Sequence, residues 1–509
     1  MLYAAPAQAQ EVRIGLSAAI TSLDPHFYNA TPNHTVALNI FEPLVSRDAT
    51  GRLMPSLATS WKSISDTVWE FNLRKGVHWH DGSFFSAKDV VFSLNRVKNV
   101  PGAPGGFSGL INTIVKVESV DDLTVHITTS VPTPNLPMQL SFIEIVSQKA
   151  GSISTTADYN SGRAMIGTGP YKFEKYVTNE RLSLVRNDDW WNGKPQWAHV
   201  TYEVVTNAAT RTTSILAGDI DVAETPPAQD IERLRNDSRF RLFSAKGLRV
   251  AYVMPFYQAS ADAEPVTDAS GNRITPSPLT NLAVRKALSG AIDRSGLASK
   301  IMFGTAEPTG QFLPPGVFSS LSDVGVPKYD PVAAKKLLAE SGYPDGFSLT
   351  LTATNDRVPY SVEVAQAIAQ MWSRIGVRTK VNAVPTSIGI KLASNQSVPV
   401  YIDNWGNSSF EAGSILGSLL GTVDPGKSRG TYNWSRYSNP ALDQQVDTAL
   451  RTVDTLQREK LLQDASRVAL DNLAVIPLFN FVNYWVTRKG YAYVPRADGL
   501  TLANAITAQ

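Results

Sequence analysis

The stretch WEFNLRKGVHWHDGSFFSAKDVVFSLNR, residues 69–96, decides the fold of this chain. From residue 67 to residue 74 apolar and polar side chains alternate, which is typical of a half-buried β-strand. Asp81-Gly82 predicts a turn. Ser86 then offers a helix N-cap, and apolar residues follow at helical spacing: Val90, Val91, Leu94 and Val97. The stretch therefore predicts a strand, a turn and a helix in direct succession.

The same stretch contains two histidines, His78 and His80, one residue apart and next to Asp81. On a strand, residues i and i+2 share one face, so both imidazoles could approach one metal ion. No third ligand lies nearby in the sequence, and a His-x-His pair alone is a weak signal. We therefore predict a structural role for this pair, with no bound metal and no other cofactor.

Length and composition set limits on the class of protein. At about 150 residues per domain, 509 residues suggest about three domains. Apolar residues make up 43% of the chain, enough for several cores, so global disorder is excluded. A net charge of +2 without a basic run indicates no nucleic-acid partner. The absence of cysteine excludes disulfides, thiolate nucleophiles and a lipid-modified N-terminal cysteine.

The first ten residues, MLYAAPAQAQ, carry a small-x-small pattern at Ala7-Gln8-Ala9. That pattern is typical of a signal-peptidase site, whereas the charged and apolar regions of a whole signal peptide are missing. We interpret residues 1–10 as the remnant of a signal peptide or a simple Ala/Gln-rich tail. The first interpretation predicts an exported protein of the periplasm.

The remaining chain alternates between strand and helix patterns. Hairpin signals dominate the first half, as in KVESVDDLTVHITTS around Asp121-Asp122. Helical and strand periodicities alternate in the second half. No internal repeat is visible in the sequence. No low-complexity linker marks a boundary between domains. We therefore expect an α/β protein whose domains are built from discontinuous pieces of the chain.

Catalytic motifs are missing from the sequence. No Gly-x-Ser-x-Gly elbow is present, and GTGPYKF at residues 167–173 is too short for a phosphate-binding loop. The histidines are scattered and do not form a His-Glu-x-x-His motif. The sequence therefore predicts that the protein is not an enzyme and has no catalytic residues.

Several blocks, in order, resemble one known family. NIFEPLVSRDATGRLMPSLATSW at residues 39–61, followed by residues 69–96, resembles the signature of the peptide/nickel family of extracellular solute-binding proteins. These are receptors of ABC importers and include dipeptide- and oligopeptide-binding proteins. The later blocks RTTSILAGDIDVA, LAVRKALSGAIDR and AIAQMWSRIGV are also similar to family blocks. The resemblance extends over nearly the whole chain from about Glu11.

The resemblance implies a two-lobed α/β fold of the periplasmic-binding-protein type II (Venus-flytrap) class, with an extra inserted domain. On that template, domain I comprises residues 11–44, 166–246 and 478–509. Domain II, the inserted domain, comprises 45–165, and domain III, the second lobe, comprises 247–477. Strands near Ala245 and Pro477 would form a hinge, and the lobes would close over a ligand held between them.

The function implied is that of a periplasmic substrate-binding protein that captures a short peptide or peptide-like solute. It would act as a monomer and deliver the solute to a membrane permease with a separate ATPase. The alternative within the family is a receptor for a non-peptide solute: an opine, a sugar conjugate, an oligosaccharide, or a nickel or other metal chelate. An exported chaperone-like or signalling protein is a further alternative.

The resemblance also indicates ligand-binding residues. In the loop DPHFYNATPN after the first strand, it points to Tyr28 and Asn29, and more weakly to His26 and Thr31. In NDRVPYS, Arg357 would present a planar fork to a carboxylate and Tyr360 a stacking wall.

The block DNWGNSSFEAGS, residues 403–414, departs from the pattern of peptide-binding relatives. They place acidic residues after a Gly-Trp pair, and an aspartate there binds the peptide α-ammonium group. Trp405 matches the aromatic position, but Asn and Ser residues replace the acidic positions. Within this block, Glu411 is the one carboxylate after Trp405, and Asp403, which precedes Trp405, could take the place of the missing aspartate. The Asn/Ser-rich lining would also suit an uncharged polar ligand such as a sugar. The candidate contacts in and beyond this block are Trp405, Asn407, Ser408, Glu411, Tyr432 and Asn433.

Overall fold

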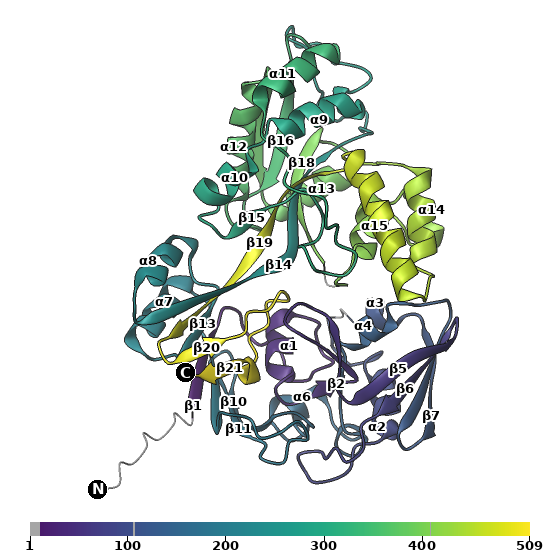
Figure 1. Ribbon diagram of the computed structural model, residues 1–509, viewed down its shortest axis with the longest axis vertical. Helices are drawn as coiled ribbons and strands as arrows, with labels where there is room; N and C mark the ends of the chain where they lie inside the picture. Colours follow the sequence, from purple (N-terminus) through teal and green to yellow (C-terminus); the bar gives the residue numbers. More distant parts are fainter. Residues whose placement is uncertain (1–10, 105–106, 408) are drawn as a thin grey trace. The chain divides into compact units, whose positions relative to one another are not determined.

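In a computed structural model the chain folds into two compact units (Figure 1). The structure describes residues 11–104, 107–407 and 409–509. The first unit comprises the chain up to Ala245 together with Asn483–Gln509, and the second comprises Lys246–Val482. The segment interpreted as a signal-peptide remnant, residues 1–10, lies outside the described residues. The boundaries of the three predicted domains stay a prediction.

A mixed sheet forms the core of the first unit. Its strand order is β10 (Tyr171–Val177), β11 (Arg181–Arg186), β12 (His199–Val204), β1 (Glu11–Leu16), β13 (Val222–Glu224) and β19 (Ile476–Arg488). β1 is parallel to both β12 and β13. Val12, Ile14 and Leu16 share one face of β1 and are all buried, so this face of the strand packs in the core.

The predicted strand-turn-helix at residues 69–96 is confirmed. β6 (Val68–Leu73) buries Trp69, Phe71 and Leu73. It belongs to a four-stranded antiparallel sheet in the order β5 (Ala58–Ser65), β6, β8 (Thr124–Thr129), β7 (Ile114–Asp121). α2 (Ala87–Arg96) begins after Ser86, whose backbone N–H donates to Asp89 in a capping box. α2 packs on this sheet.

The remaining elements of the first unit are shorter. The strands are β2 (Glu42–Pro43), β3 (Val45–Arg47), β4 (Leu53–Pro55), β9 (Glu144–Ile145), β20 (Tyr491–Tyr493) and β21 (Ile506–Ala508). The helices are α1 (Thr31–Ala37), α3 (Ser108–Ile111), α4 (Leu136–Leu140), α5 (Gln148–Gly151), α6 (Thr156–Asn160), α7 (Ala208–Ala217) and α8 (Ile231–Asn236).

The part of the same sheet that belongs to the second unit holds the parallel strands that position the candidate site. The order is β19, β14 (Phe240–Pro255), β18 (Val400–Gly406), β16 (Phe347–Thr354), β17 (Val377–Val384). β16 is parallel to β17 and β18, whereas β14 is antiparallel to β18. β14 and β19 each begin in one unit and end in the other.

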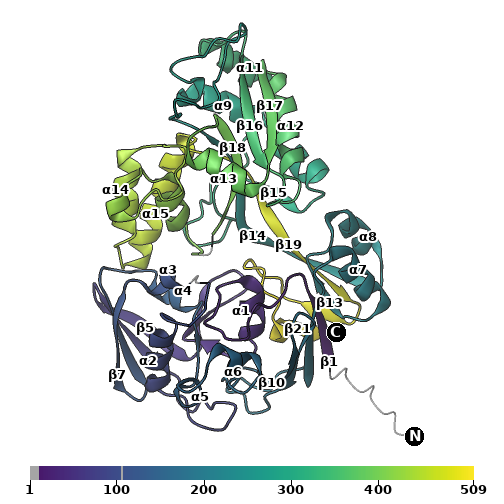
Figure 2. The same ribbon diagram turned by 180° about the vertical axis from the view of Figure 1, so that it is seen from behind.

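Helices cover this part of the sheet. α12 (Ser361–Ser373) packs on β16 and β17, and its Ile368 and Trp372 are fully buried against the core. α9 (Leu282–Gly290) packs on α11 (Pro331–Glu340). α14 (Pro440–Ala449) and α15 (Thr455–Asp471) lie side by side in both views (Figures 1 and 2). The shorter elements are α10 (Arg294–Gly296), β15 (Ala306–Pro308) and α13 (Thr386–Ser394).

Within the described part of the chain, the helices are too short or too polar to cross a bilayer.

Candidate functional site

The centre of the candidate site is an ion pair between Arg357 and Asp403. Arg357 lies in the loop between β16 and α12, and its Nη1 is 3.2 Å from Oδ1 of Asp403 on β18. The Asp403 side chain is buried, and the backbone N–H of Asn404 also donates to it. Burial raises the pKa of Asp403, and the positive charge of Arg357 opposes that shift. The Arg357 side chain is 34% exposed, so it can also bind a group from solution.

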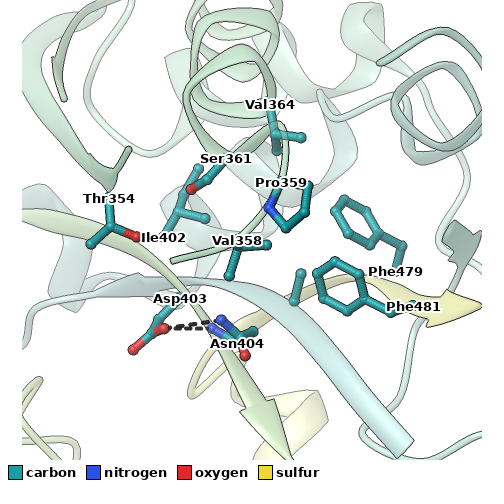
Figure 3. A pocket seen from close by; sticks show the side chains of 11 residues that line it. Thr354, Val358, Pro359, Ser361, Val364, Ile402, Asp403, Asn404, Phe479 and Phe481 are labelled. Atoms are coloured by element: carbon teal, nitrogen blue, oxygen red, sulfur yellow. Dashed lines mark hydrogen bonds between the residues drawn. The ribbon is translucent and has the colours of Figure 1, made fainter. Parts of the chain in front are cut away.

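A pocket lies beside this ion pair, entirely within the second unit (Figure 3). Figure 3 shows Phe479 and Phe481 on one side of the pocket, and Asp403 and Asn404 on the other. The two phenyl rings meet edge to face with centroids 5.4 Å apart. The lining residues are Ala251, Thr354, Val358, Pro359, Ser361, Val364, Ile402, Asp403, Asn404, Phe479 and Phe481. The pocket therefore combines an apolar wall with a carboxylate and an amide.

Aromatic rings of β18 and of a later segment of the chain form a row near Asp403. The rings of Trp405 and Tyr432 lie 5.6 Å apart, and those of Tyr432 and Trp434 6.3 Å apart, both edge to face. Trp434 also meets Tyr401 of β18. Tyr432 is 51% exposed, so its ring is accessible to a ligand. The row brings the predicted contacts Trp405 and Tyr432 together and adds Trp434, which the sequence did not single out.

The loop after Trp405 is held by hydrogen bonds of its own side chains. Asn407 is buried, its Nδ2 donates to the Glu411 carbonyl, and its Oδ1 accepts from Ser409 Oγ at 2.8 Å. Trp405 Nε1 donates to Ser414 Oγ. The amide of Asn407 therefore organises the loop. Ser408, another predicted contact, lies outside the described residues.

Glu411 and Asn433 are buried, with partners inside the second unit. The Glu411 carboxylate pairs with Arg458 of α15 at 2.6 Å. Asn433 Nδ2 donates to the carbonyls of Gly421 and Tyr437, and both bonds are 2.8 Å long. Each side chain thus has a structural task.

Tyr360 lies at the start of α12 and faces another aromatic residue. It is the N-cap, in the left-handed region at φ 61°. Its ring centroid is 5.4 Å from that of Phe303, which is 48% exposed. Tyr360 and Phe303 therefore form a pair of neighbouring rings, and stacking of a ligand on Tyr360 stays a prediction.

In the first unit, the predicted contacts Tyr28 and Asn29 follow β1. Tyr28 is exposed, and Asn29 Oδ1 lies 2.8 Å from Nε2 of His34. His34 Nδ1 lies 2.8 Å from the Glu144 carboxylate, which is buried. His26 is buried as well, and its Nε2 donates to the Glu144 carbonyl. This buried network fixes the loop that carries Tyr28 and Asn29.

The His78/His80 pair has a structural environment. Nε2 of His80 donates to the Gly169 carbonyl at 3.0 Å, and its Nδ1 accepts from the Gly167 backbone N–H at 3.2 Å. Burial lowers the pKa of His80 to about 4. His78 instead meets the ring of Phe84 edge to face. The residues that the structure describes contain no cluster of three or more His, Cys, Asp or Glu that could hold a metal ion.

The first unit also contains a larger concavity, with an empty volume of about 1080 Å³, beside Glu42 and the adjacent Trp190 and Trp191. Glu42 accepts hydrogen bonds from both indole N–H groups and from the Thr168 hydroxyl. Burial raises the pKa of Glu42 to about 7. Because these hydrogen bonds satisfy the carboxyl group, it does not by itself require a ligand.

The fold and the site define a solute-binding protein of the class used by ABC importers. A family model described as bacterial extracellular solute-binding proteins, family 5 Middle, matches residues 52–427. This chain therefore belongs to family 5 of the bacterial extracellular solute-binding proteins. Members of the family bind small solutes and deliver them to ABC permeases; they are transport proteins rather than enzymes.

Two curated relatives are similar over most of the chain. The glutathione-binding protein GsiB of Pectobacterium atrosepticum is 28% identical, covering 90% of this chain and 86% of GsiB. Heme-binding protein A of Haemophilus influenzae is also 28% identical, covering 87% of this chain and 82% of that protein.

Solved structures agree on the fold. HbpA2 from Haemophilus parasuis has a TM-score of 0.86 at 24% identity, covering 98% of this chain and 100% of HbpA2. The periplasmic murein tripeptide-binding protein MppA, in an unliganded open form, has a TM-score of 0.85 at 23% identity, covering 99% and 98% of the two chains. The predicted fold class, the two-lobed type II periplasmic binding protein, is confirmed.

As ligand contacts, the predicted residues all stay predictions. The structure brings Arg357 close to Asp403, and Trp405 close to Tyr432, within the second unit. Tyr28 and Asn29 belong to the first unit. Arg249, whose Nη1 donates to Oδ1 of the pocket residue Asn404, was not singled out from the sequence, although it is a single charge within the otherwise apolar strand segment LRVAYVMPF.

Proposed function

We propose that this protein captures a short peptide or peptide-like solute in the periplasm and delivers it to the permease of an ABC importer, without catalysing a reaction itself. The observation that carries the proposal is the partly exposed Arg357, held by Asp403, which lines a small and mostly apolar pocket. Among the relatives, GsiB is named for glutathione and MppA for a murein tripeptide, both peptide-like solutes.

Arg357 is proposed to bind a ligand carboxylate. Its guanidinium contacts Asp403 through Nη1 at 3.2 Å to one oxygen and 3.4 Å to the other. A planar guanidinium presents several N–H donors in a fork that matches the two oxygens of a carboxylate. Because Asp403 is buried and fixed by the Asn404 backbone, it holds the guanidinium in place before a ligand arrives.

The amino end of the ligand is proposed to be bound differently from the pattern of peptide-binding relatives. Glu411 is committed to Arg458, and separating a buried pair costs several kcal/mol, about 3–5 when one partner is removed. Asp403 is paired with Arg357, so neither carboxylate is left for the ligand's ammonium group, while Trp405 and Tyr432 supply apolar contact.

Capture is proposed to involve both units. Tyr28 and Asn29 belong to the first unit, and Arg357 and Trp405 to the second. A ligand that contacts both units favours the arrangement in which all of those contacts form, so binding shifts the population toward a closed state. The domain boundaries inferred from the sequence belong to this proposal, as does action as a monomer.

A non-peptide solute of the same family, such as an opine, a sugar conjugate, an oligosaccharide or a metal chelate, is the second candidate. The row formed by Trp405, Tyr432 and Trp434 favours it, because aromatic faces pack well on sugar rings and on planar ligands. The polar loop is a weaker argument for it, since Asn407 is buried and bonded within the loop.

The experiment is to denature the purified protein and identify the released solute by mass spectrometry. The emptied and refolded protein is then tested by thermal unfolding against tripeptides, opines and oligosaccharides. A ligand at 100 times its Kd stabilises the native state by about 2.7 kcal/mol. A peptide-like solute that co-purifies and raises the melting temperature supports the proposal. Stabilisation by oligosaccharides alone, with no effect of any peptide, contradicts it.

A further inference from the structure

Arg249 lies beside the candidate site, on the strand next to Asp403 and Asn404. It is part of β14 and faces Gly406 of β18 in the antiparallel register. Its Nη1 donates to Oδ1 of Asn404 at 3.1 Å. A Cβ added at Gly406 would lie 3.8 Å from Nη2, so the guanidinium lies close to the backbone at the start of the 407–414 loop. The residue is exposed.

The hydrogen bonds form a continuous chain between two arginines. Arg249 donates to the Asn404 amide, and Asn404 donates through its backbone N–H to Asp403 Oδ1. Asp403 in turn pairs with Arg357. Asp403 and Asn404 line the pocket shown in Figure 3, so each of the two guanidinium groups contacts one lining residue of that pocket.

The hydrogen-bonded series from Arg249 to Arg357 contains more positive than negative charge. The positive charges of Arg249 and Arg357 repel each other, and the negative charge of Asp403 attracts both. Two guanidinium groups therefore share one carboxylate. The carboxylate of Glu411, in the adjacent loop, is neutralised by Arg458 instead. The cluster of Arg249, Arg357 and Asp403 carries a net positive charge at neutral pH.

An excess positive charge of this kind favours an anion from solution. Like charges held near one another repel, and a bound carboxylate relieves that repulsion while making charge-assisted hydrogen bonds. Arg357 alone would suffice for the terminal carboxylate of an ordinary peptide. A second guanidinium, in contact with another lining residue of the pocket, has a use when the ligand carries a second carboxylate.

We infer that Arg249 is a second anion-binding residue of the ligand site, and that the preferred solute is a peptide or peptide-like molecule with at least two carboxylates. The inference rests on the proposed function, since it names the chemical class of that same ligand. If Arg249 were purely structural, it would serve only to position Asn404. The affinity of the protein would then not depend on whether the ligand is acidic or neutral.

The test uses three tripeptides of alanine with one glutamate at the first, second or third position, each matched with the corresponding glutamine peptide. Binding to the emptied full-length protein is measured by isothermal titration calorimetry. We expect at least one glutamate peptide to bind about tenfold or more tightly than its glutamine counterpart, as a charge-assisted hydrogen bond implies.

The variants are Arg249→Gln and, as a matched control, Arg374→Gln, an arginine of the same unit that follows α12 and contacts Tyr329. Arg249→Gln should remove the preference for the glutamate peptide, because it weakens binding of that peptide by about tenfold more than binding of the glutamine peptide. Arg374→Gln should keep the preference. Unfolding curves confirm that both variants are folded.

Two different results would contradict, respectively, the inference on Arg249 and the proposed function. If peptides bind but no glutamate peptide exceeds its glutamine counterpart, or Arg249→Gln keeps the preference, the inference is wrong and the proposed function stands. If no peptide binds at all, the proposed function itself is contradicted.

Discussion

The carboxylate of Glu411 lies 2.6 Å from Nη2 of Arg458, and both side chains are buried. Burial raises the pKa of Glu411, and Arg458 opposes the shift. The Arg458 guanidinium also lies over the ring of Phe318, 4.9 Å from its centroid. The acidic residue that follows Trp405 in the sequence therefore joins its loop to α15.

Replacing Glu411→Gln should destabilise the fold rather than abolish binding. The change leaves the buried Arg458 without its carboxylate, which costs about 3–5 kcal/mol. Denaturant unfolding measures the loss, and Glu340→Gln, which removes an exposed pair with Lys336, should change the free energy of unfolding by less than about 1 kcal/mol. A large loss of ligand affinity at unchanged stability would show instead that Glu411 contacts the ligand.

Replacing Arg357→Gln should weaken binding of the co-purifying solute by roughly tenfold to a hundredfold, the equivalent of a charge-assisted hydrogen bond of about 1.5–3 kcal/mol. Calorimetric titration measures the change. Arg378→Gln, an exposed arginine on β17 that contacts Ser348, is the matched control. Equal affinities for the wild type and Arg357→Gln would contradict the carboxylate role.

Replacing Tyr432→Ala should reduce ligand affinity by about threefold to tenfold, since aromatic packing contributes about 0.5–1.5 kcal/mol beyond area burial. Because Tyr432 is 51% exposed, the free energy of unfolding should change little. Ligand-dependent tryptophan fluorescence should also change, as Trp405 and Trp434 both contact its ring. An unaltered titration in both readouts would remove Tyr432 from the site.

Glu42 should make stability depend on pH. Its pKa is raised from 4.5 to about 7 in the fold, so the native state holds the proton more tightly than the unfolded chain. This contribution is present below pH 4.5 and is lost as the pH rises through about 7. The free energy of unfolding is measured from pH 5 to 8 for the wild type and for Glu42→Gln. The stability of the wild type relative to the variant should fall by about 3 kcal/mol as the pH rises. A constant difference would contradict the raised pKa.

His78→Ala and His80→Ala form a matched pair that separates metal binding from structure. His80→Ala should cost about 1–3 kcal/mol, because the Gly167 N–H loses its acceptor, whereas the Gly169 carbonyl keeps its hydrogen bond from Asn187. His78→Ala removes only an edge-to-face contact with Phe84 and should be milder. Metal analysis of the wild type should find no stoichiometric metal ion. An ion that is bound to the wild type but missing from both variants would show that the two histidines form a metal site.

Local signals made much of the fold predictable. The alternation in β6 and the N-cap at Ser86 depend on neighbours a few residues away, so each could be recognised in the sequence. Arg357 and Trp405 were found because each lies in a block that resembles the family. Trp434 was missed because its significance depends on its ring contacts with Tyr432 and Tyr401, which no sequence spacing reveals.

By itself, the sequence determined the family, the α/β class and the strand-turn-helix at residues 69–96, because these follow from periodicity and from ordered blocks along the chain. Only the tertiary structure decided what individual polar residues do. Glu411 and Asn433 became structural, His80 joined two backbone groups, and Arg249 joined Asp403 and Arg357. The physical reason is that a buried charge or amide is satisfied by partners distant in sequence, and those partners are chosen by packing.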